Sequence, residues 1–186
     1  MMSRLLTVGH STRSLEEFIG LLRENYVKIL VDVRRYPVSR RYPHFNQEKL
    51  AEILPKHAIR YEWLGEELGG FRRPALEDSP NKAWRSGGFR NYADHTLTVQ
   101  FREGVEKLLK LTEEGEVAFM CAEKQYWRCH RRIISDYLTV KGHVVIHIVE
   151  KGRVEPHNLT GFCRIVDGEL RYPINIVEHK SIPTQP

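Results

Sequence analysis

The sequence predicts an α/β fold, an open and mostly parallel sheet with helices on both faces, plus a C-terminal β-hairpin. Two observations predict the sheet: in each half of the chain an apolar run directly follows a predicted helix. Such unbroken apolar strands are typical of parallel sheets whose two faces are both covered. A third observation predicts the hairpin, because Asp167-Gly168 separates two short strand-like segments.

The first 35 residues predict a strand, a helix and a second strand. Residues 5–8 form a short apolar run. Ser14 suits a helix N-cap, Glu17 is its capping-box partner three residues later, and Asn25 ends the helix. Residues 28–33 then form a nearly continuous apolar strand.

The second half of the chain repeats this pattern. Residues 101–111 predict an amphipathic helix that Gly115 stops, and residues 116–121 predict the strand that follows it. A further helix over roughly 129–140 leads into a strand over 143–148. Two strand–helix–strand units favour one sheet with right-handed crossovers.

The segment between the two units is less regular. Asn46 is expected to cap a helix that runs through Ile53, and residues 58–64 predict another strand. Residues 65–95 are rich in Gly, Pro, Arg and aromatic residues and are predicted to form long loops.

The domain prediction divides the chain near residue 150. Residues 1–150 are expected to form the α/β domain, and residues 151–186 a hairpin extension and tail packed on the same domain. Residues 180–186 are expected to fray at its end.

The composition excludes a wholly disordered or fibrous chain, since 41% of the residues are hydrophobic and 28% are charged. Apolar runs are too short to cross a bilayer, and the N-terminus lacks a secretory signal pattern, so we expect a cytoplasmic protein. The formal charge is 29 − 24 = +5. A basic chain suggests an anionic partner, either a small molecule or a nucleic acid. Three cysteines do not suggest a disulfide framework, and we expect reduced thiols.

Polar residues follow three of the predicted strands. His10 follows the first, Asp32 and Arg34 end the second, and Cys121 and Glu123 end the fourth along the chain. Because the carboxyl ends of parallel strands meet at one edge of a sheet, these side chains are expected to converge on a crevice there.

The catalytic candidates are His10, Asp32, Cys121 and Glu123. A helix N-terminus and nearby arginines favour the thiolate of Cys121, which would act as a nucleophile while Glu123 or His130 handles protons. In the alternative interpretation Cys121 is a small buried hydrophobe and Glu123 forms a salt bridge to Arg131 or Arg34.

The anion-binding candidates are arginines and neighbouring residues of the polar loops. Residues 34–43 hold four arginines and two tyrosines, and residues 71–73 and 84–92 repeat the mixture. Guanidinium groups bind phosphates bidentately, and tyrosines stack on bases. A solvated basic loop is the alternative. The set is Arg34, Arg35, Arg40, His130, Arg131 and Tyr92.

Glycine-rich phosphate motifs and the nucleophile-elbow motif do not occur, which argues against nicotinamide cofactors and nucleoside-triphosphate motors. Cys129-His130, eight residues after Cys121, could bind a metal, but closed zinc sites generally use a second short-spaced pair. No metal ligand is therefore assigned, and the cofactor remains unspecified. A Cys121–Cys129 disulfide is a further alternative, and His130 could simply hydrogen-bond at a helix N-terminus.

Several segments together form a recognisable pattern, of which the stretch from Cys-Ala-Glu to Cys-His-Arg is the most specific. They include Val8-Gly9-His10-Ser11-Thr12, Val31-Asp32-Val33-Arg34, Leu68-Gly69-Gly70, Tyr92-Ala93-Asp94, Met120-Cys121-Ala122-Glu123 and Cys129-His130-Arg131. In these segments, over roughly residues 5–150, the sequence resembles domain-of-unknown-function family 488. The resemblance implies an α/β fold and a shared site, and it supplies no reaction, substrate or catalytic residues.

These observations favour an enzyme that acts on a phosphorylated or nucleic-acid-like anionic substrate at the carboxyl edge of the sheet. One alternative is a non-catalytic nucleic-acid-binding module that uses the Arg/Tyr loops. Another is a thiol redox or metal-binding protein that uses Cys121 and Cys129.

Overall fold

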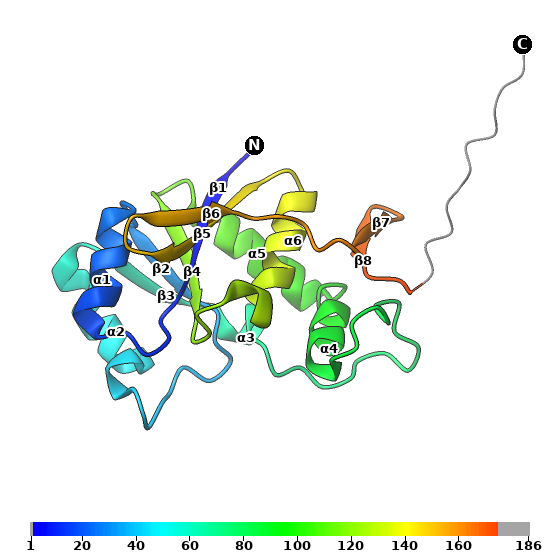
Figure 1. The fold of residues 1–186 in the computed structure, drawn as a ribbon, viewed down its shortest axis with the longest axis horizontal. Coiled ribbons are helices and arrows are strands. Elements are labelled where there is room, and N and C mark those ends of the chain that lie inside the picture. The colour runs from blue at the N-terminus through cyan, green and yellow to red at the C-terminus, as the bar shows by residue number, and fades with distance from the viewer. Residues whose placement is uncertain (1, 175–186) are drawn as a thin grey trace, which may run out of the picture.

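The structure is a computed structural model that describes residues 2–174, and it confirms the predicted α/β fold (Figure 1). A six-stranded sheet has the order β3-β2-β4-β1-β5-β6, and a separate two-stranded sheet pairs β7 with β8. The strands are β1 (Arg4–Gly9), β2 (Ile29–Asp32), β3 (Arg60–Trp63), β4 (Val117–Cys121), β5 (Val144–Glu150), β6 (Arg153–Pro156), β7 (Arg164–Val166) and β8 (Glu169–Arg171).

Strands β1 to β5 run parallel, and β6 pairs antiparallel with β5. Strand β4 lies between β1 and β2, and β1 lies between β4 and β5, so each predicted crossover passes over one strand. The three strands that carry the polar motifs are therefore neighbours. Strand β6 was not predicted from the sequence.

Helices cover both faces of the sheet (Figure 1). The α-helices are α1 (Leu15–Glu24), α2 (Gln47–Ile53), α3 (Gly65–Leu68), α4 (Gly87–His95), α5 (Val99–Leu111) and α6 (Arg131–Val140). Short 3-10 helices are η1 (Pro43–Phe45), η2 (Leu54–His57) and η3 (Tyr126–Arg128).

Alternation along β1 shows how the two cores form. Leu5 packs with α5 and α6 on one face, whereas Leu6 packs with α1 and α2 on the other. Successive strand residues point to opposite faces, so one apolar strand supplies both cores. Phe18 of α1 and Phe101 of α5 are fully buried in the two clusters.

Local capping explains where several elements begin. The predicted capping box at α1 is confirmed, because Ser14 Oγ accepts from the Glu17 N–H while the Glu17 carboxylate accepts from the Ser14 N–H. Asn25 is the C-cap of that helix, as predicted. Asn46 is the N-cap residue of α2, but its Oδ1 accepts from the Ser39 N–H and so fixes the preceding loop instead.

One local prediction was wrong. The segment 65–95 contains α3 and α4, so it is not a continuous loop; tertiary contacts support these helices, since Tyr92 of α4 is buried and donates to the Leu68 carbonyl of α3. Helix α5 ends at Leu111, the last residue predicted for it, but its C-cap is Thr112 and Gly115 lies beyond its end.

The predicted hairpin is confirmed, with Asp167 and Gly168 at φ of 53° and 76° in its turn. Beyond it, Tyr172 is buried and its hydroxyl donates to Asp136 of α6 at 2.8 Å. The predicted fraying of residues 180–186 lies outside the described residues. Between residues 2 and 174, no helix has the length and apolar character needed to span a membrane.

Candidate functional site

The carboxyl ends of β1, β2 and β4 lie side by side. Gly9 is in register with Cys121, and Asp32 is in register with Met120. The alignment continues past the strands, because the His10 N–H donates to the Cys121 carbonyl at 3.0 Å and the Val33 N–H donates to the Met120 carbonyl at 3.0 Å. The structure thus brings the polar strand ends to one edge of the sheet.

Asp32 and Arg34 form an ion pair and hydrogen-bond to each other. Both are buried, and Arg34 Nη2 lies 2.5 Å from Asp32 Oδ2. Nε of Arg34 also donates to Asp32, and Nη2 donates to the Phe45 carbonyl at 2.7 Å. Tyr61 of β3 donates to Asp32 at 2.8 Å, and the buried carboxylate helps to raise the pKa of that phenol, after burial itself. This pair therefore stabilises the end of β2, and few of its hydrogen-bond donors and acceptors are left for a substrate.

His10 completes this network in a defined protonation state. Its Nδ1 lies 3.0 Å from the Ser11 carbonyl and must donate, so Nε2 is free to accept from Arg34 Nη1 at 3.2 Å. Burial, followed by the charge of Arg34, lowers the pKa of His10 to about 4. The ring stacks on Phe45 with centroids 4.2 Å apart. A neutral, enclosed imidazole results.

Cys121, Cys129 and His130 form the reactive cluster of the edge, which we call the Cys–Cys–His cluster. The two sulfurs and the imidazole Nδ1 all lie within 4.8 Å of one another. Nδ1 is 3.5 Å from Cys129 Sγ and 3.9 Å from Cys121 Sγ. Cys129 is buried, whereas Cys121 and His130 are partly exposed.

The orientation of His130 follows from a backbone contact. Its Nε2 lies 2.8 Å from the Val33 carbonyl at the end of β2, and an oxygen acceptor there requires Nε2 to carry the proton. In the neutral ring the Nδ1 lone pair then faces the sulfurs. Gly70 leaves room beside that nitrogen, because a Cβ at Gly70 would lie 3.2 Å from Nδ1.

The two thiols titrate as a pair. Burial would raise the pKa of Cys129, but a hydrogen bond from Cys121 and the charge of Arg131 help to hold it well below its ordinary value. The same hydrogen bond to Cys129, together with burial, raises the pKa of Cys121 well above its ordinary value. The two shifts are opposite in sign, so loss of a proton is easier at Cys129 than at Cys121.

Arg131 holds the loop that joins the cysteines. It is 1% exposed, donates through Nη2 to the Glu123 carbonyl and through Nη1 to Thr7 Oγ1 at 3.1 Å. Glu123 turns its carboxylate to the Gln125 N–H at 3.2 Å, so the side chain stabilises the loop. Neither of the predicted salt bridges of Glu123, to Arg34 or to Arg131, occurs between these described side chains.

The remaining anion-binding candidates are scattered. Arg35 follows β2, is partly exposed and donates one group to the Glu66 carbonyl at 3.0 Å. Arg40 is exposed on the loop before η1. Tyr92 is fully buried, and its ring centroid lies 5.0 Å from that of His130. Tyr92 therefore packs against the Cys–Cys–His cluster from inside the protein.

Cys129 is the residue that the sequence-based set of catalytic candidates omitted. Its position one residue before His130 was the available signal, since the turn from β4 into α6 returns the chain to Cys121 after eight residues. The contribution of the Val33 carbonyl had no sequence signal, because any residue type supplies that oxygen.

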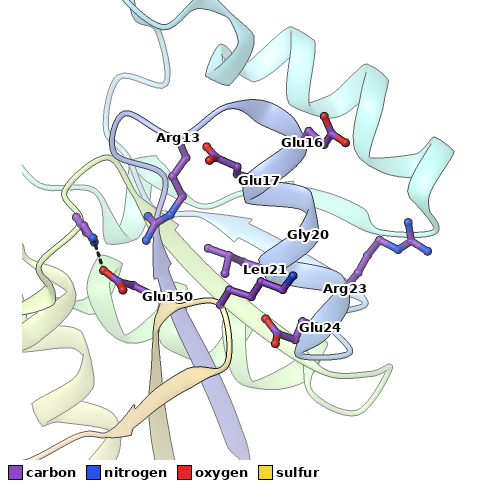
Figure 2. Close-up of a pocket in the computed structure, with 10 residues that line it drawn as sticks. Arg13, Glu16, Glu17, Gly20, Leu21, Arg23, Glu24 and Glu150 are labelled. Atoms are coloured by element: carbon purple, nitrogen blue, oxygen red, sulfur yellow. Dashed lines mark hydrogen bonds and ion pairs between the residues drawn. The ribbon is translucent and has the colours of Figure 1, made fainter.

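A separate hollow of about 890 Å³ lies along α1, next to Arg13, Lys124 and the end of β5. Figure 2 shows Arg13 and Glu150 on one side of it and Glu17, Gly20 and Glu24 of α1 on the other. Lys124 pairs with Glu150 at 2.6 Å across its rim. Its charges are mixed in sign, and its lining does not include the Cys–Cys–His cluster.

Comparison with known proteins identifies a family. The family model described as "Domain of unknown function DUF488" matches residues 14–138, a span that includes β2, β4 and the Cys–Cys–His cluster. No curated protein matches the chain, and no solved structure matches it.

Proposed function

The chain belongs to the DUF488 family, and from the geometry of its site we propose that it is an enzyme whose reactive centre is the Cys–Cys–His cluster. The substrate class is an anion, either a phosphorylated small molecule or a nucleic acid. The partner surface is the carboxyl edge of the sheet, where parallel α/β proteins generally bind ligands.

One observation carries this proposal: two sulfurs and an imidazole nitrogen converge at that edge with the Nδ1 lone pair directed at the sulfurs. Buried polar groups normally form hydrogen bonds within the protein, and Asp32 and Arg34 do so. The cluster instead keeps nucleophilic or ligating atoms together, and the partial exposure of Cys121 and His130 supports access from solvent.

The charges around the cluster support an anionic substrate. Arg128 is exposed one residue before Cys129, and Arg35 is partly exposed next to the Gly69-Gly70 segment that touches His130. The buried Arg131 adds a positive charge behind the loop, and its described partners are a hydroxyl and carbonyl oxygens. The guanidinium groups of Arg35 and Arg128 would attract and orient a phosphate or carboxylate, and the buried charge of Arg131 would add to the attraction.

A second candidate is a nucleic-acid-binding module without turnover. The observation that favours it is the pair of Arg41 and Tyr42, in which the exposed guanidinium lies 5.4 Å from the ring centroid. Arginine and aromatic side chains side by side are typical of surfaces that bind single strands. For both candidates we expect a cytoplasmic protein, because thiols stay reduced in the cytoplasm.

We would test the enzyme with three anionic probes: p-nitrophenyl phosphate, bis(p-nitrophenyl) phosphate and a short single-stranded oligonucleotide. Turnover of at least one probe is expected for the unmodified protein. Cys129→Ser should lower that rate about 100-fold, the scale of a lost acid–base or nucleophilic group. The matched control is Cys163→Ser, because Cys163 is also a free buried thiol but is not a member of the Cys–Cys–His cluster.

Turnover that survives both Cys129→Ser and His130→Ala would contradict a reactive role for the cluster. Oligonucleotide binding that weakens steeply with salt, with no turnover of any probe, would favour the binding module instead. Failure of all three probes to bind or react would contradict the anionic substrate class.

A further inference from the structure

The donor atoms of the Cys–Cys–His cluster are those of a metal centre. We propose that Cys121, Cys129 and His130 hold one divalent ion of the zinc class, with a fourth coordination position open to water or substrate. This inference names the cofactor of the proposed reactive centre, and it rests on the proposed function only in taking that cluster as the centre.

The separations of the ligand atoms fit this assignment. In a tetrahedral zinc site with Zn–S near 2.3 Å and Zn–N near 2.0–2.1 Å, a sulfur and a nitrogen lie about 3.6 Å apart. Nδ1 of His130 is 3.5 Å from Cys129 Sγ and 3.9 Å from Cys121 Sγ. Both sulfur–nitrogen separations therefore lie within a few tenths of an ångström of the tetrahedral value, and the two sulfurs lie within 4.8 Å of each other.

The surroundings of His130 are those of a metal ligand. A ligating histidine usually donates its other ring N–H to a carbonyl or carboxylate, which fixes the tautomer. Here Nε2 donates to the Val33 carbonyl at 2.8 Å, and Nδ1 is left as a Lewis base. Gly70 keeps the space beside Nδ1 free of a side chain, since a Cβ there would approach that nitrogen to 3.2 Å.

Three protein ligands imply an open position. Among residues 2–174, no further cysteine, histidine or carboxylate joins the group. Structural zinc sites have four protein ligands, whereas catalytic sites have three and keep one position for water or substrate. In the sequence, the lack of a second short-spaced cysteine pair argued against a metal. A site with three protein ligands does not need that pair.

Arg131 makes the loaded centre attractive to anions. No carboxylate within the described part of the chain pairs with Arg131, whose guanidinium lies behind the cysteine loop. The charges of a divalent ion and two thiolates cancel, so the buried arginine leaves the centre positive. An anion at the fourth position would compensate that charge, and a bound ion would supply Lewis acidity there.

The ligand set favours zinc over the alkaline-earth ions. Thiolates and imidazole suit Zn²⁺ and other late first-row metals, whereas Mg²⁺ and Ca²⁺ take oxygen ligands. The competing use of the same atoms is a Cys121–Cys129 disulfide, which would remove both sulfur ligands.

The test uses the full chain, reduced and handled without oxygen, and titrated with Co²⁺ as a spectroscopic substitute for Zn²⁺. We expect one equivalent of Co²⁺ to bind with a thiolate-to-cobalt charge-transfer band and tetrahedral d–d bands, and Zn²⁺ to displace it. Cys121→Ser, Cys129→Ser and His130→Ala should each weaken Co²⁺ binding by more than the roughly 10–100-fold that changes outside the ligand set cost. Cys163→Ser should bind Co²⁺ like the unmodified protein.

A second measurement does not depend on variants that fold. X-ray absorption at the zinc edge of the unmodified, zinc-loaded protein should give two sulfur ligands near 2.3 Å and at least one nitrogen near 2.0 Å. A shell of oxygen and nitrogen only, or Co²⁺ binding that survives Cys129→Ser, would overturn the metal centre.

The two proposals fail separately. If the reduced protein binds no Co²⁺ while both cluster thiols alkylate freely and the probes are turned over, the metal is wrong and a metal-free thiol enzyme remains. If the metal binds as described and no anionic probe reacts, the metal centre stands and the proposed activity fails. A Cys121–Cys129 disulfide recovered by mass spectrometry from protein that never bound metal also overturns the metal.

Discussion

The Asp32 carboxylate, at the end of β2, hydrogen-bonds to other groups of the protein. Its carboxylate is completely buried and accepts from the Arg34 backbone N–H, the Arg34 guanidinium and the Tyr61 hydroxyl. A buried carboxylate is tolerated only when it is paired and hydrogen-bonded in this way. We therefore interpret Asp32 as a structural residue that orients Arg34, which in turn contacts His10.

Asp32→Asn should destabilise the protein by about 3–5 kcal/mol, because it leaves the charge of Arg34 buried without its partner. Urea unfolding monitored by circular dichroism would measure this loss. Tyr61→Phe is the control: it removes one donor to Asp32 but no charge, so a loss of about 1 kcal/mol is expected. A variant Asp32→Asn that keeps full stability but loses turnover would instead identify Asp32 as catalytic.

The turn from β4 into α6 is the element that makes the Cys–Cys–His cluster. It packs so closely on the end of β1 that a Cβ on Gly9 would lie 2.0 Å from the Glu123 carbonyl oxygen. Arg131 donates to the same carbonyl from inside. Gly9 and Arg131 thus both contact the backbone of the turn at Glu123, between Cys121 and Cys129.

Gly9→Ala should displace this turn and disrupt the cluster. We expect a drop in Co²⁺ affinity of at least about 10-fold, the smaller effect of a change outside a ligand set. The matched control is Gly20→Ala in α1, where a Cβ meets nothing within 4 Å; it should keep Co²⁺ affinity and add about 0.5–1 kcal/mol of stability through helix propensity. Equal Co²⁺ binding in both variants would show that the turn does not depend on Gly9.

A buried hydrogen-bond chain links the cluster side of the sheet to the C-terminal segment. The chain begins at Arg131, which donates to the Thr7 hydroxyl, and that hydroxyl lies 2.7 Å from His147 Nδ1. It continues from His147 Nε2 to His157 Nδ1 at 2.9 Å. It ends where His157 Nε2 lies 2.9 Å from Asp136. Each group donates a hydrogen bond to the next, from the guanidinium of Arg131 to the carboxylate of Asp136. This chain joins β1, β5, α6 and the segment after β6 into one polar core.

Global stability should fall as the solution becomes acidic, because three histidines are buried in the neutral form. Burial is the largest cause in each case, and it lowers the pKa of His10 and His95 to about 4 and that of His147 to about 2. In the unfolded chain a histidine titrates near 6.5, so below that pH the unfolded state binds more protons. The stabilisation is complete above pH 6.5 and declines as the pH falls toward 4.

Each such histidine contributes a slope of up to about 1.4 kcal/mol per pH unit between pH 6 and pH 4. Urea unfolding at several pH values would measure the total slope. His10→Gln should reduce it by about 1 kcal/mol per pH unit, since one titrating group is removed. A slope that is unchanged in His10→Gln would mean that His10 is protonated in the folded protein.

Most elements were predictable because their signals are local. The capping box of Ser14 and Glu17, the Asp167-Gly168 turn and the apolar runs of β1, β2 and β4 all depend on residues within a few positions of each other. Helices α3 and α4 were missed because their glycines and aromatic residues resemble loop composition. Their stability comes from distant contacts, such as that of Tyr92 with Leu68.

The sequence alone determined the fold class, the order of most strands and helices along the chain, and which strand ends carry polar side chains. Those properties follow from periodicity, capping and turn residues, which act over short distances along the chain. Only the tertiary structure decided two things. The Arg34 guanidinium hydrogen-bonds to Asp32, Phe45 and His10. The side chains of Cys129 and His130 lie next to that of Cys121. The physical reason is that side-chain partners depend on sheet order and on backbone oxygens such as the Val33 carbonyl, which no local pattern of residue types specifies.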